Sequence, residues 1–529
     1  MKETEFNLLE QPWIRVIKSD CTVEEVSLTD ALLRAHEYQA LRGELPTQDV
    51  AVLRLLLAVL HTVFSRVDEN GNEAPFETAA DARKRWKALW DLGHFPETPI
   101  RMYLQKYRER FWLFHPERPF YQVNEAQNGT AYYAPKLNGE LSESSNKVRL
   151  FPSRSQQTKN GITYAEAARW LLHVNAFDDT SAKPKQKGLP SPGVGWMGKL
   201  GLIYASGVNL YETLMLNLTF LQDGQQLYKE NHPCWELEQP HIAERVEIPI
   251  PDNQAELLTL QSRRLLLNRT ENTVTGFCLL GGDFCPRENA FIEQMTAWRK
   301  LSGKGAKADG YQPRRHDASQ QMWREFSALF VPQEGSHRPG VVLWTEMLKK
   351  KRLIDKKRMI SYCIASVQYG DKDFFVTDIF QDSLTFHADL LSDLGIAWQM
   401  RISAEIERCE QLAEQIGYLF SDLVKAAGGS GNIQSAKEQL YYRLDKPFRD
   451  WLEQLDPQSM DIDEQMKVWQ TQAKRIGTTL AQEMVDQAGT SAFIGREVTE
   501  KVKGKEHTMF YSSPKAYNQF LYNVRKIYP

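Results

Sequence analysis

The chain has 529 residues, which is too long for one ordinary hydrophobic core, so we expect at least two domains. Charged residues make up 25% and hydrophobic residues 42%, as is usual for a globular protein, and the formal net charge is only −3. No global electrostatic field therefore favours nucleic acid, and any binding of nucleic acid must depend on local basic stretches.

Cysteine use and the N-terminal half favour a cytoplasmic protein. The six cysteines contain no C-x-x-C pair, which argues against a structural zinc or a redox dithiol and fits a reducing compartment. The first residues, MKETEFNLLEQPW, lack the apolar core of a signal peptide. The most apolar segment, residues 50–64, includes Arg54 and His61 and is too short to cross a bilayer. We expect a buried helix there and no contact with a membrane.

Residues 144–164 form a stretch without acidic residues. It contains Lys147 and Arg149, with Phe151 close behind them. Basic residues around an exposed aromatic ring can hold a single-stranded nucleic acid by phosphate contact and stacking. The alternative is a polar surface loop with Phe151 turned inward. A helix is expected to follow, from about residue 163 to residue 175.

Residues 183–201, KPKQKGLPSPGVGWMGKLG, are named the glycine loop here. Gly and Pro disfavour helix and strand, and the stretch carries four lysines and no acid. A cationic loop without bulky side chains lets main-chain N–H groups approach a polyanion. The alternative is a solvated linker, although a linker has no use for an indole such as that of Trp196. Asn209 and Glu212 predict the start of the next helix.

Two strand pairs and a helical C-terminus follow. Residues 256–280 predict strand, turn and strand, residues 298–315 predict a loop, and residues 361–369 and 374–380 predict a hairpin. Its tip, Gly370-Asp371-Lys372-Asp373, is polar and charged, and is called the hairpin tip below. Apolar residues at spacings of three and four predict helices over residues 398–427, 435–455, 463–487 and 513–528. The predicted fold class is α+β: a mixed α/β N-terminal domain, residues 1–386, followed by a four-helix bundle, residues 387–529.

Signals for catalysis are weak throughout the sequence. Residues 301–307, LSGKGAK, lack the spacing of a Walker loop, and the glycine loop lacks the G-x-G-x-x-G pattern of a dinucleotide site. Asp178 and Asp179 could bind a metal, but adjacent acids before a loop are more often solvated or capping groups. His316 and Asp317 are neighbours without a nucleophile signature. We therefore expect no enzyme activity, no cofactor and no metal.

Five motifs in order resemble a known family. They are FNLLEQPWIRV from residue 6, HPERPFYQ from 115, SSNKVRLF from 144, GVGWMGKLG with SGVNLYETLMLNL from 193, and LQSRR from 260. Together they resemble the CasA-like large subunit of type I-E Cascade, the CRISPR RNA-guided surveillance complex. The resemblance implies a non-catalytic subunit that reads the protospacer-adjacent motif (PAM) in duplex DNA, helps start R-loop formation and recruits a helicase-nuclease. It also implies CRISPR RNA and the other backbone, small and RNA-processing subunits as partners.

The resemblance assigns roles to three groups of residues. At the tip some relatives have glutamine and asparagine where this chain has Lys372 and Asp373. Rival interpretations are a nucleotide-binding enzyme that uses residues 188–201, and a purely structural helical scaffold. The implied sites are the PAM-contacting glycine loop (Lys183, Lys185, Lys187, Gly193, Gly195, Trp196, Gly198, Lys199), the DNA wedge (Gly370, Asp371, Lys372, Asp373) and the guide-handle contact (Asn146, Lys147, Arg149, Phe151).

Overall fold

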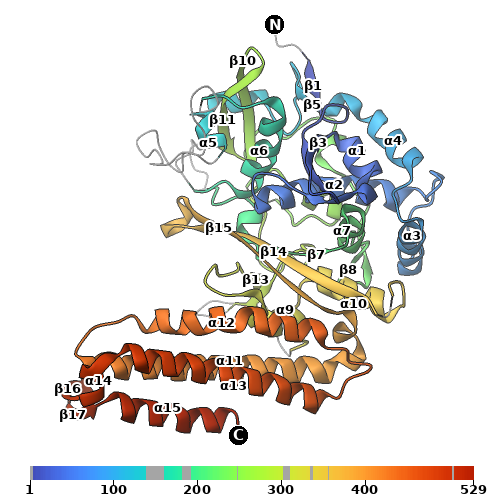
Figure 1. Ribbon diagram of the computed structural model, residues 1–529. Helices are drawn as coiled ribbons and strands as arrows, with labels where there is room; N and C mark the ends of the chain where they lie inside the picture. Colours follow the sequence, from blue (N-terminus) through green and yellow to red (C-terminus); the bar gives the residue numbers. More distant parts are fainter. Residues whose placement is uncertain are drawn as a thin grey trace. The chain divides into compact units, whose positions relative to one another are not determined.

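The chain divides into two compact units (Figure 1). The computed structural model describes residues 4–138, 160–180, 192–246, 248–301, 310–333, 337–355, 357–502 and 505–529. The N-terminal unit comprises Met1–Gln320, Pro332–Leu353 and Ile360–Ser383, and the C-terminal unit comprises Gln321–Val331, Ile354–Met359 and Leu384–Pro529. The predicted boundary at residue 386 stays a prediction. The chain enters the C-terminal unit for the last time at Leu384, and two earlier segments also belong to it.

Helix α2 (Pro46–Arg66) forms the core of the N-terminal unit. Pro46 lies in its first turn, where a missing N–H costs no hydrogen bond, and residues 50–64 are all buried, as the sequence predicts. Within the described residues, α2 is the one helix long and apolar enough to cross a membrane, and 94% of its most apolar window is buried in the fold. Such a helix needs apolar side chains on every face. It packs against α4 (Glu97–Lys106), α6 (Tyr164–Phe177), α7 (Leu210–Asn217) and α8 (Gln254–Leu258).

Small antiparallel sheets surround this core. Three of those in the described residues have three strands, in the orders β3-β2-β4, β10-β11-β6 and β15-β14-β7. The others in the described part of the N-terminal unit are the pairs β1-β5, β8-β9 and β12-β13, whereas the pair β16-β17 lies in the C-terminal unit. The strand bounds are β1 Glu5–Asn7, β2 Ile14–Lys18, β3 Val23–Val26, β4 Tyr38–Leu41, β5 Trp112–Phe114, β6 Thr130–Tyr133, β7 Ile203–Ser206, β8 Leu221–Gln222, β9 Gln226–Leu227, β10 Arg263–Thr270, β11 Thr273–Gly281, β12 Trp298–Lys300, β13 Tyr311–Pro313, β14 Met359–Tyr369, β15 Val376–His387, β16 Arg496–Val502 and β17 Lys505–Tyr511.

Local signals account for most of the elements near the predicted sites. The side chains of Thr163 and Asn209 cap α6 and α7 by accepting backbone N–H groups. The predicted hairpin is confirmed as β14 and β15. The remaining α-helices of the N-terminal unit are α1 (Leu28–Leu33), α3 (Ala79–Leu92), α5 (Ala134–Leu137) and α10 (Gly340–Lys350).

In the middle of the chain, the strand pair predicted over residues 256–280 is confirmed as β10 and β11 with a later start, and the predicted loop over residues 298–315 is wrong. The first strand of the 256–280 pair begins only at Arg263, because the side chain of Asn253 accepts the N–H of Glu256 and caps the short helix α8. Residues 298–315 are not a continuous loop, because β12 and β13 pair within them, with Trp298 opposite Pro313. In the first case a helix cap overrides a composition that is typical of a strand. In the second case strand pairing overrides a composition that is typical of a loop.

The C-terminal unit is helical. Helix α11 (Ile396–Ala427) packs against α12 (Ile433–Gln454), α13 (Ile462–Gln487), α14 (Gly489–Ile494) and α15 (Ser513–Ile527), and Figure 1 shows the four long helices side by side. Phe448 lies in the core between Trp469, at a centroid distance of 5.0 Å, and Trp323, at 4.5 Å. Trp323 precedes α9 (Phe326–Phe330) and donates its indole N–H to Asp445 at 3.0 Å, so segment 321–331 is part of this core.

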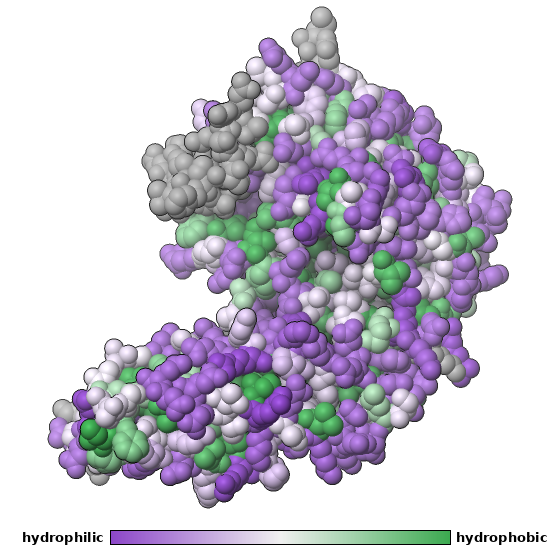
Figure 2. All heavy atoms as spheres, in the orientation of Figure 1, coloured by the Kyte–Doolittle hydropathy of each residue, from purple (hydrophilic) through white to green (hydrophobic). Residues whose placement is uncertain are grey.

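Apolar side chains gather at one end of the C-terminal unit. Phe493 and Ile494 of α14 are 67% and 70% exposed, and Met509 and Phe510 of β17 are 51% and 46% exposed. Figure 2 shows hydrophobic residues at this end of the helices, on a face that is otherwise mostly hydrophilic.

The predicted fold class is confirmed, with a mixed α+β N-terminal part and a helical C-terminal part.

Candidate nucleic-acid interface

One buried guanidinium, that of Arg263, bonds both the segment just before the glycine loop and Gly193 within the loop. Arg263, 1% exposed at the start of β10, donates to a carboxylate oxygen of Asp178 at 2.5 Å and to the carbonyl oxygen of Asp179 at 3.1 Å. The same side chain donates to the carbonyl oxygen of Gly193 at 2.6 Å. The carboxylate of Asp179 pairs with Lys136 at 3.1 Å. Both acids therefore pair with cations, an arrangement that fixes the segment before the loop rather than one that exposes two metal ligands.

The second half of the loop is anchored in the fold. The N–H of Gly195 donates to the carbonyl oxygen of Asp178 at 2.9 Å, and a Cβ at Gly195 would lie 2.3 Å from the carbonyl oxygen of Ala176. Trp196 is 3% exposed, and its indole N–H donates at 2.8 Å to Glu293. In this conformation Trp196 is an anchor, and contact of its ring with DNA stays a prediction.

A buried ion pair completes that anchor. Glu293 accepts two hydrogen bonds from Arg54 of α2, at 2.8 and 2.9 Å, in the bidentate geometry that is strongest for this pair. Burial opposes the charge of Glu293, but the adjacent Arg54 and the indole of Trp196 hold its pKa below the usual range. The loop is thereby tied to the core helix α2.

Three other residues of the glycine loop are less deeply anchored than Trp196 or lie against the hairpin: Gly193, Gly198 and Lys199. Gly193 has φ +64°, and a Cβ there would meet no atom of the described residues within 4 Å. A Cβ at Gly198 would lie 2.3 Å from the hydroxyl oxygen of Tyr369, the last residue of β14. Lys199 is partly buried, with its ammonium 5.8 Å from the ring centre of Trp196. Burial, followed by the nearby Arg263, lowers the pKa of Lys199 to about 8.

The hairpin tip lies against the start of the glycine-loop region. The hydroxyl of Thr180 donates to the carbonyl oxygen of Lys372 at 2.9 Å, and the N–H of Thr180 donates to that of Asp373, also at 2.9 Å. Lys372 and Asp373 both have positive φ, of 54° and 58°, a conformation that non-glycine residues adopt only when their surroundings impose it. Lys372 is exposed. The carboxylate of Asp373 accepts both ends of the Arg315 guanidinium, at 2.7 and 3.1 Å.

The structure thus brings two of the three predicted groups together. Gly193, Gly195, Trp196, Gly198 and Lys199 lie around the contacts that also hold the hairpin tip. The sequence interpretation missed Arg263, Arg315 and Thr180. Arg263 lies in the LQSRR motif and Arg315 precedes the His316–Asp317 pair, so both were in view without an assigned role. Lys183, Lys185, Lys187, Asn146, Lys147, Arg149 and Phe151 lie outside the described residues.

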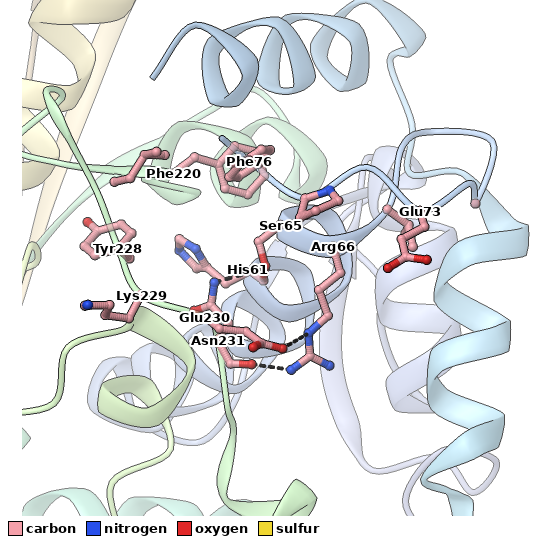
Figure 3. A pocket seen from close by; sticks show the side chains of 14 residues that line it. His61, Ser65, Arg66, Glu73, Phe76, Phe220, Tyr228, Lys229, Glu230 and Asn231 are labelled. Atoms are coloured by element: carbon pink, nitrogen blue, oxygen red, sulfur yellow. Dashed lines mark hydrogen bonds and ion pairs between the residues drawn. The ribbon is translucent and has the colours of Figure 1, made fainter. Parts of the chain in front are cut away.

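The N-terminal unit also contains a cavity of about 650 Å³, built mainly from the C-terminal end of α2 and residues 220–231 (Figure 3). His61 packs edge-on against Phe220 and Tyr228, at centroid distances of 5.8 and 6.4 Å. Burial lowers the pKa of His61 to about 3, so its imidazole is neutral. The guanidinium of Arg66 donates to a carboxylate oxygen of Glu236 at 2.8 Å. Because this cation is already paired, the cavity is poorly suited to bind a phosphate. Among the predicted DNA-contacting residues that the structure describes, none lines this cavity.

Comparison with known proteins identifies close relatives of the chain. The model of the family described as CRISPR-associated protein Cse1 matches residues 7–480. A curated CRISPR-associated protein CasA/Cse1 from Thermus thermophilus is 33% identical over 428 residues, which cover 80% of this chain and 79% of the relative. The crystal structure of Thermobifida fusca Cse1 matches with a TM-score of 0.84 and 29% identity, over 99% of this chain and 98% of that one. A chain of a structure titled CRISPR RNA-guided surveillance complex matches with a TM-score of 0.69 and 16% identity, over 92% of this chain and 100% of that chain.

Proposed function

Because the chain belongs to the CRISPR-associated protein Cse1 family, we propose that it is the non-catalytic large subunit of an RNA-guided type I-E Cascade complex. In this role it recognises the PAM in duplex DNA, helps start R-loop formation and recruits a separate helicase-nuclease. The complex joins the chain to CRISPR RNA and to the other backbone, small and RNA-processing subunits in the cytoplasm. A neighbour of the same fold is titled as a surveillance complex, which supports the assembly.

The observation that carries the proposal is the pair of hydrogen bonds from Thr180 to Lys372 and Asp373. These bonds hold the segment just before the glycine loop against the hairpin tip, and Arg263 joins that segment to Gly193 of the loop. The loop and the tip can therefore meet one stretch of duplex. The minor groove offers few distinguishing hydrogen-bonding groups, and a glycine-rich backbone can enter it where a side chain cannot. Guide RNA pairing carries the rest of the sequence recognition, so a short protein-read motif is sufficient.

We propose separate tasks for the residues of the three predicted groups. Gly193 approaches base edges, and Lys183, Lys185, Lys187 and Lys199 contact backbone phosphates. Gly195, Trp196 and Gly198 hold the loop in the required shape, and Lys372 enters beneath the first base pair with Gly370, Asp371 and Asp373 as its support. Asn146, Lys147, Arg149 and Phe151 contact the guide-handle end of the complex.

The test begins with assembly. The chain is co-expressed with candidate backbone subunits, and RNA that co-purifies is sequenced, with CRISPR repeat sequence expected at one end. The purified complex is then titrated with duplexes that carry a matched or a mutated PAM, at several salt concentrations. We expect tighter binding of the matched duplex. Equal affinity for both duplexes by a complex that holds guide RNA would refute PAM recognition by this subunit.

A triple lysine variant separates recognition of the PAM sequence from general electrostatic attraction to DNA. Replacing Lys183, Lys185 and Lys187 together by alanine should weaken binding to matched and mutated duplexes alike. The slope of log affinity against log salt concentration should flatten by about 0.9 for each phosphate contact that is lost. A loss confined to the matched duplex would instead make these lysines part of the reading surface.

A further inference from the structure

Arg315 is an unassigned cation beside the hairpin tip. Its guanidinium binds the carboxylate of Asp373 through two parallel hydrogen bonds, and lies 5.0 Å from the ring centre of Tyr369. The Tyr369 hydroxyl donates to the carbonyl oxygen of Phe177 at 2.6 Å, so the ring under the guanidinium is fixed to the end of α6. The Arg315 guanidinium is therefore held in position by the fixed Tyr369 ring, independently of its contact with Asp373.

The partner of Arg315 is chemically replaceable. The planar guanidinium fork fits a phosphate as well as it fits a carboxylate. The side chains of Arg315 and Asp373 are 30% and 36% exposed, and an ion pair this accessible to water contributes little to stability. A duplex that reaches the tip would bring phosphates toward Asp373, and the like charges would repel each other.

Other cations surround the same place. The electrostatic surroundings of Lys199 include Arg263, Arg287 and Arg315, each of which disfavours its protonated form. Arg263 is committed to Asp178 and the loop carbonyls, and Arg287 is exposed. The carboxylate of Asp373 is the one acid that the described contacts place on the Arg315 guanidinium, so it offsets only part of the positive charge gathered here.

We propose that Arg315 is a phosphodiester-binding site which Asp373 occupies in the free subunit and vacates when duplex DNA binds. The phosphate replaces the carboxylate on the guanidinium fork, while Tyr369 keeps the fork in place. The hairpin tip then loses one of its two described attachments and keeps the backbone contacts with Thr180. The inference rests on the proposed function, since it requires that duplex DNA reaches the tip.

The experiment is a double-mutant cycle in the assembled, guide-loaded complex. Arg315→Gln should weaken duplex binding and flatten the salt slope by about 0.9, the value of one phosphate contact. Asp373→Asn, which keeps the side-chain shape, should tighten binding several-fold by removing the competitor. In the double variant that gain should disappear, because the exchange needs Arg315. Arg315→Lys keeps the charge without the fork and should restore only part of the affinity.

Controls separate the possible failures. Arg101 pairs with Glu97 on the surface of α4, so Arg101→Gln should leave affinity and salt slope unchanged. Thermal unfolding of each variant excludes a loss of folding. If Asp373→Asn tightens binding equally with and without Arg315, or if Arg315→Gln keeps the wild-type slope, the exchange is refuted while PAM recognition stands. If the wild-type complex does not distinguish matched from mutated duplexes, both the exchange and the proposed function fall.

Discussion

The backbone N–H of Thr180 donates to the carbonyl oxygen of Asp373 at 2.9 Å, and the Thr180 hydroxyl bonds Lys372 in the same way, across 192 positions of sequence. Thr180 directly follows Asp179, whose carbonyl oxygen accepts from Arg263. One short segment therefore connects the base of the glycine loop to the hairpin tip. A displacement of either element must strain or break these bonds, so the two elements are mechanically coupled.

The two glycines of the loop should respond differently to substitution. A Cβ at Gly195 would lie 2.3 Å from a backbone oxygen, so Gly195→Ala should destabilise the fold by about 1–3 kcal/mol, the usual cost of overpacking. Gly193→Asn adds a residue that tolerates φ +64° and whose Cβ meets no described residue within 4 Å, so its cost should be below about 1 kcal/mol. Urea unfolding measures both, and equal losses of stability would contradict this distinction.

Removing Arg263 should be costly. Arg263→Gln removes the buried cation that pairs with the carboxylate of Asp178, a change that typically costs about 3–5 kcal/mol. Asp178→Asn in the same chain removes the other charge of this pair, so the double variant should be less destabilised than the sum of the single variants. Arg315→Gln breaks a partly exposed pair and should cost no more than about 1 kcal/mol. Comparable losses for Arg263→Gln and Arg315→Gln would show that Arg263 does not fix the loop.

Local patterns predicted the elements but not their contacts. Two strand-forming runs around a turn sequence predict the hairpin over residues 361–380, although β15 runs on to His387, and apolar spacing predicts the long C-terminal helices. The contact between Thr180 and the hairpin tip has no local signal, since it depends on how distant elements pack. Trp196 drew attention as an indole in a loop, and sequence could not show that Glu293, 97 positions away, would accept its N–H.

Burial should make the chain sensitive to acid through His61. The pKa of His61 is lowered to about 3 in the folded state by burial, against about 6.5 when unfolded. Between these values the unfolded chain binds a proton that the folded chain does not, so stability falls as pH falls, by about 1.4 kcal/mol per pH unit. In urea unfolding at pH 7, 6 and 5, His61→Gln should remove this part of the slope. Exposed His94→Gln is the control, and an unchanged slope in His61→Gln would argue against the assignment.

Lys199 should make DNA binding depend on pH in the alkaline range. Burial, and after it the nearby Arg263, lowers the pKa of Lys199 to about 8. The free subunit therefore loses the positive charge of the Lys199 ammonium as pH rises from 7 to 9. A phosphate contact requires the protonated form, so affinity should fall across that range, by at most tenfold per pH unit for one proton. Lys199→Arg keeps its charge and should abolish most of the fall. Identical pH profiles for wild type and Lys199→Arg would exclude a phosphate contact at this position.

Site-specific photocrosslinking of the guide-loaded complex tests most directly whether the glycine loop and the hairpin tip form one DNA-contacting surface. A photoreactive amino acid is placed at Gly193 in one variant and at Lys372 in another, and the crosslinked bases of a PAM duplex are mapped. The account predicts that both positions crosslink within the PAM and the first base pairs beside it, and that both signals disappear when the PAM is mutated. Crosslinks from the two positions to separate regions of the duplex, or none from either in a complex that still binds the matched duplex, would contradict it.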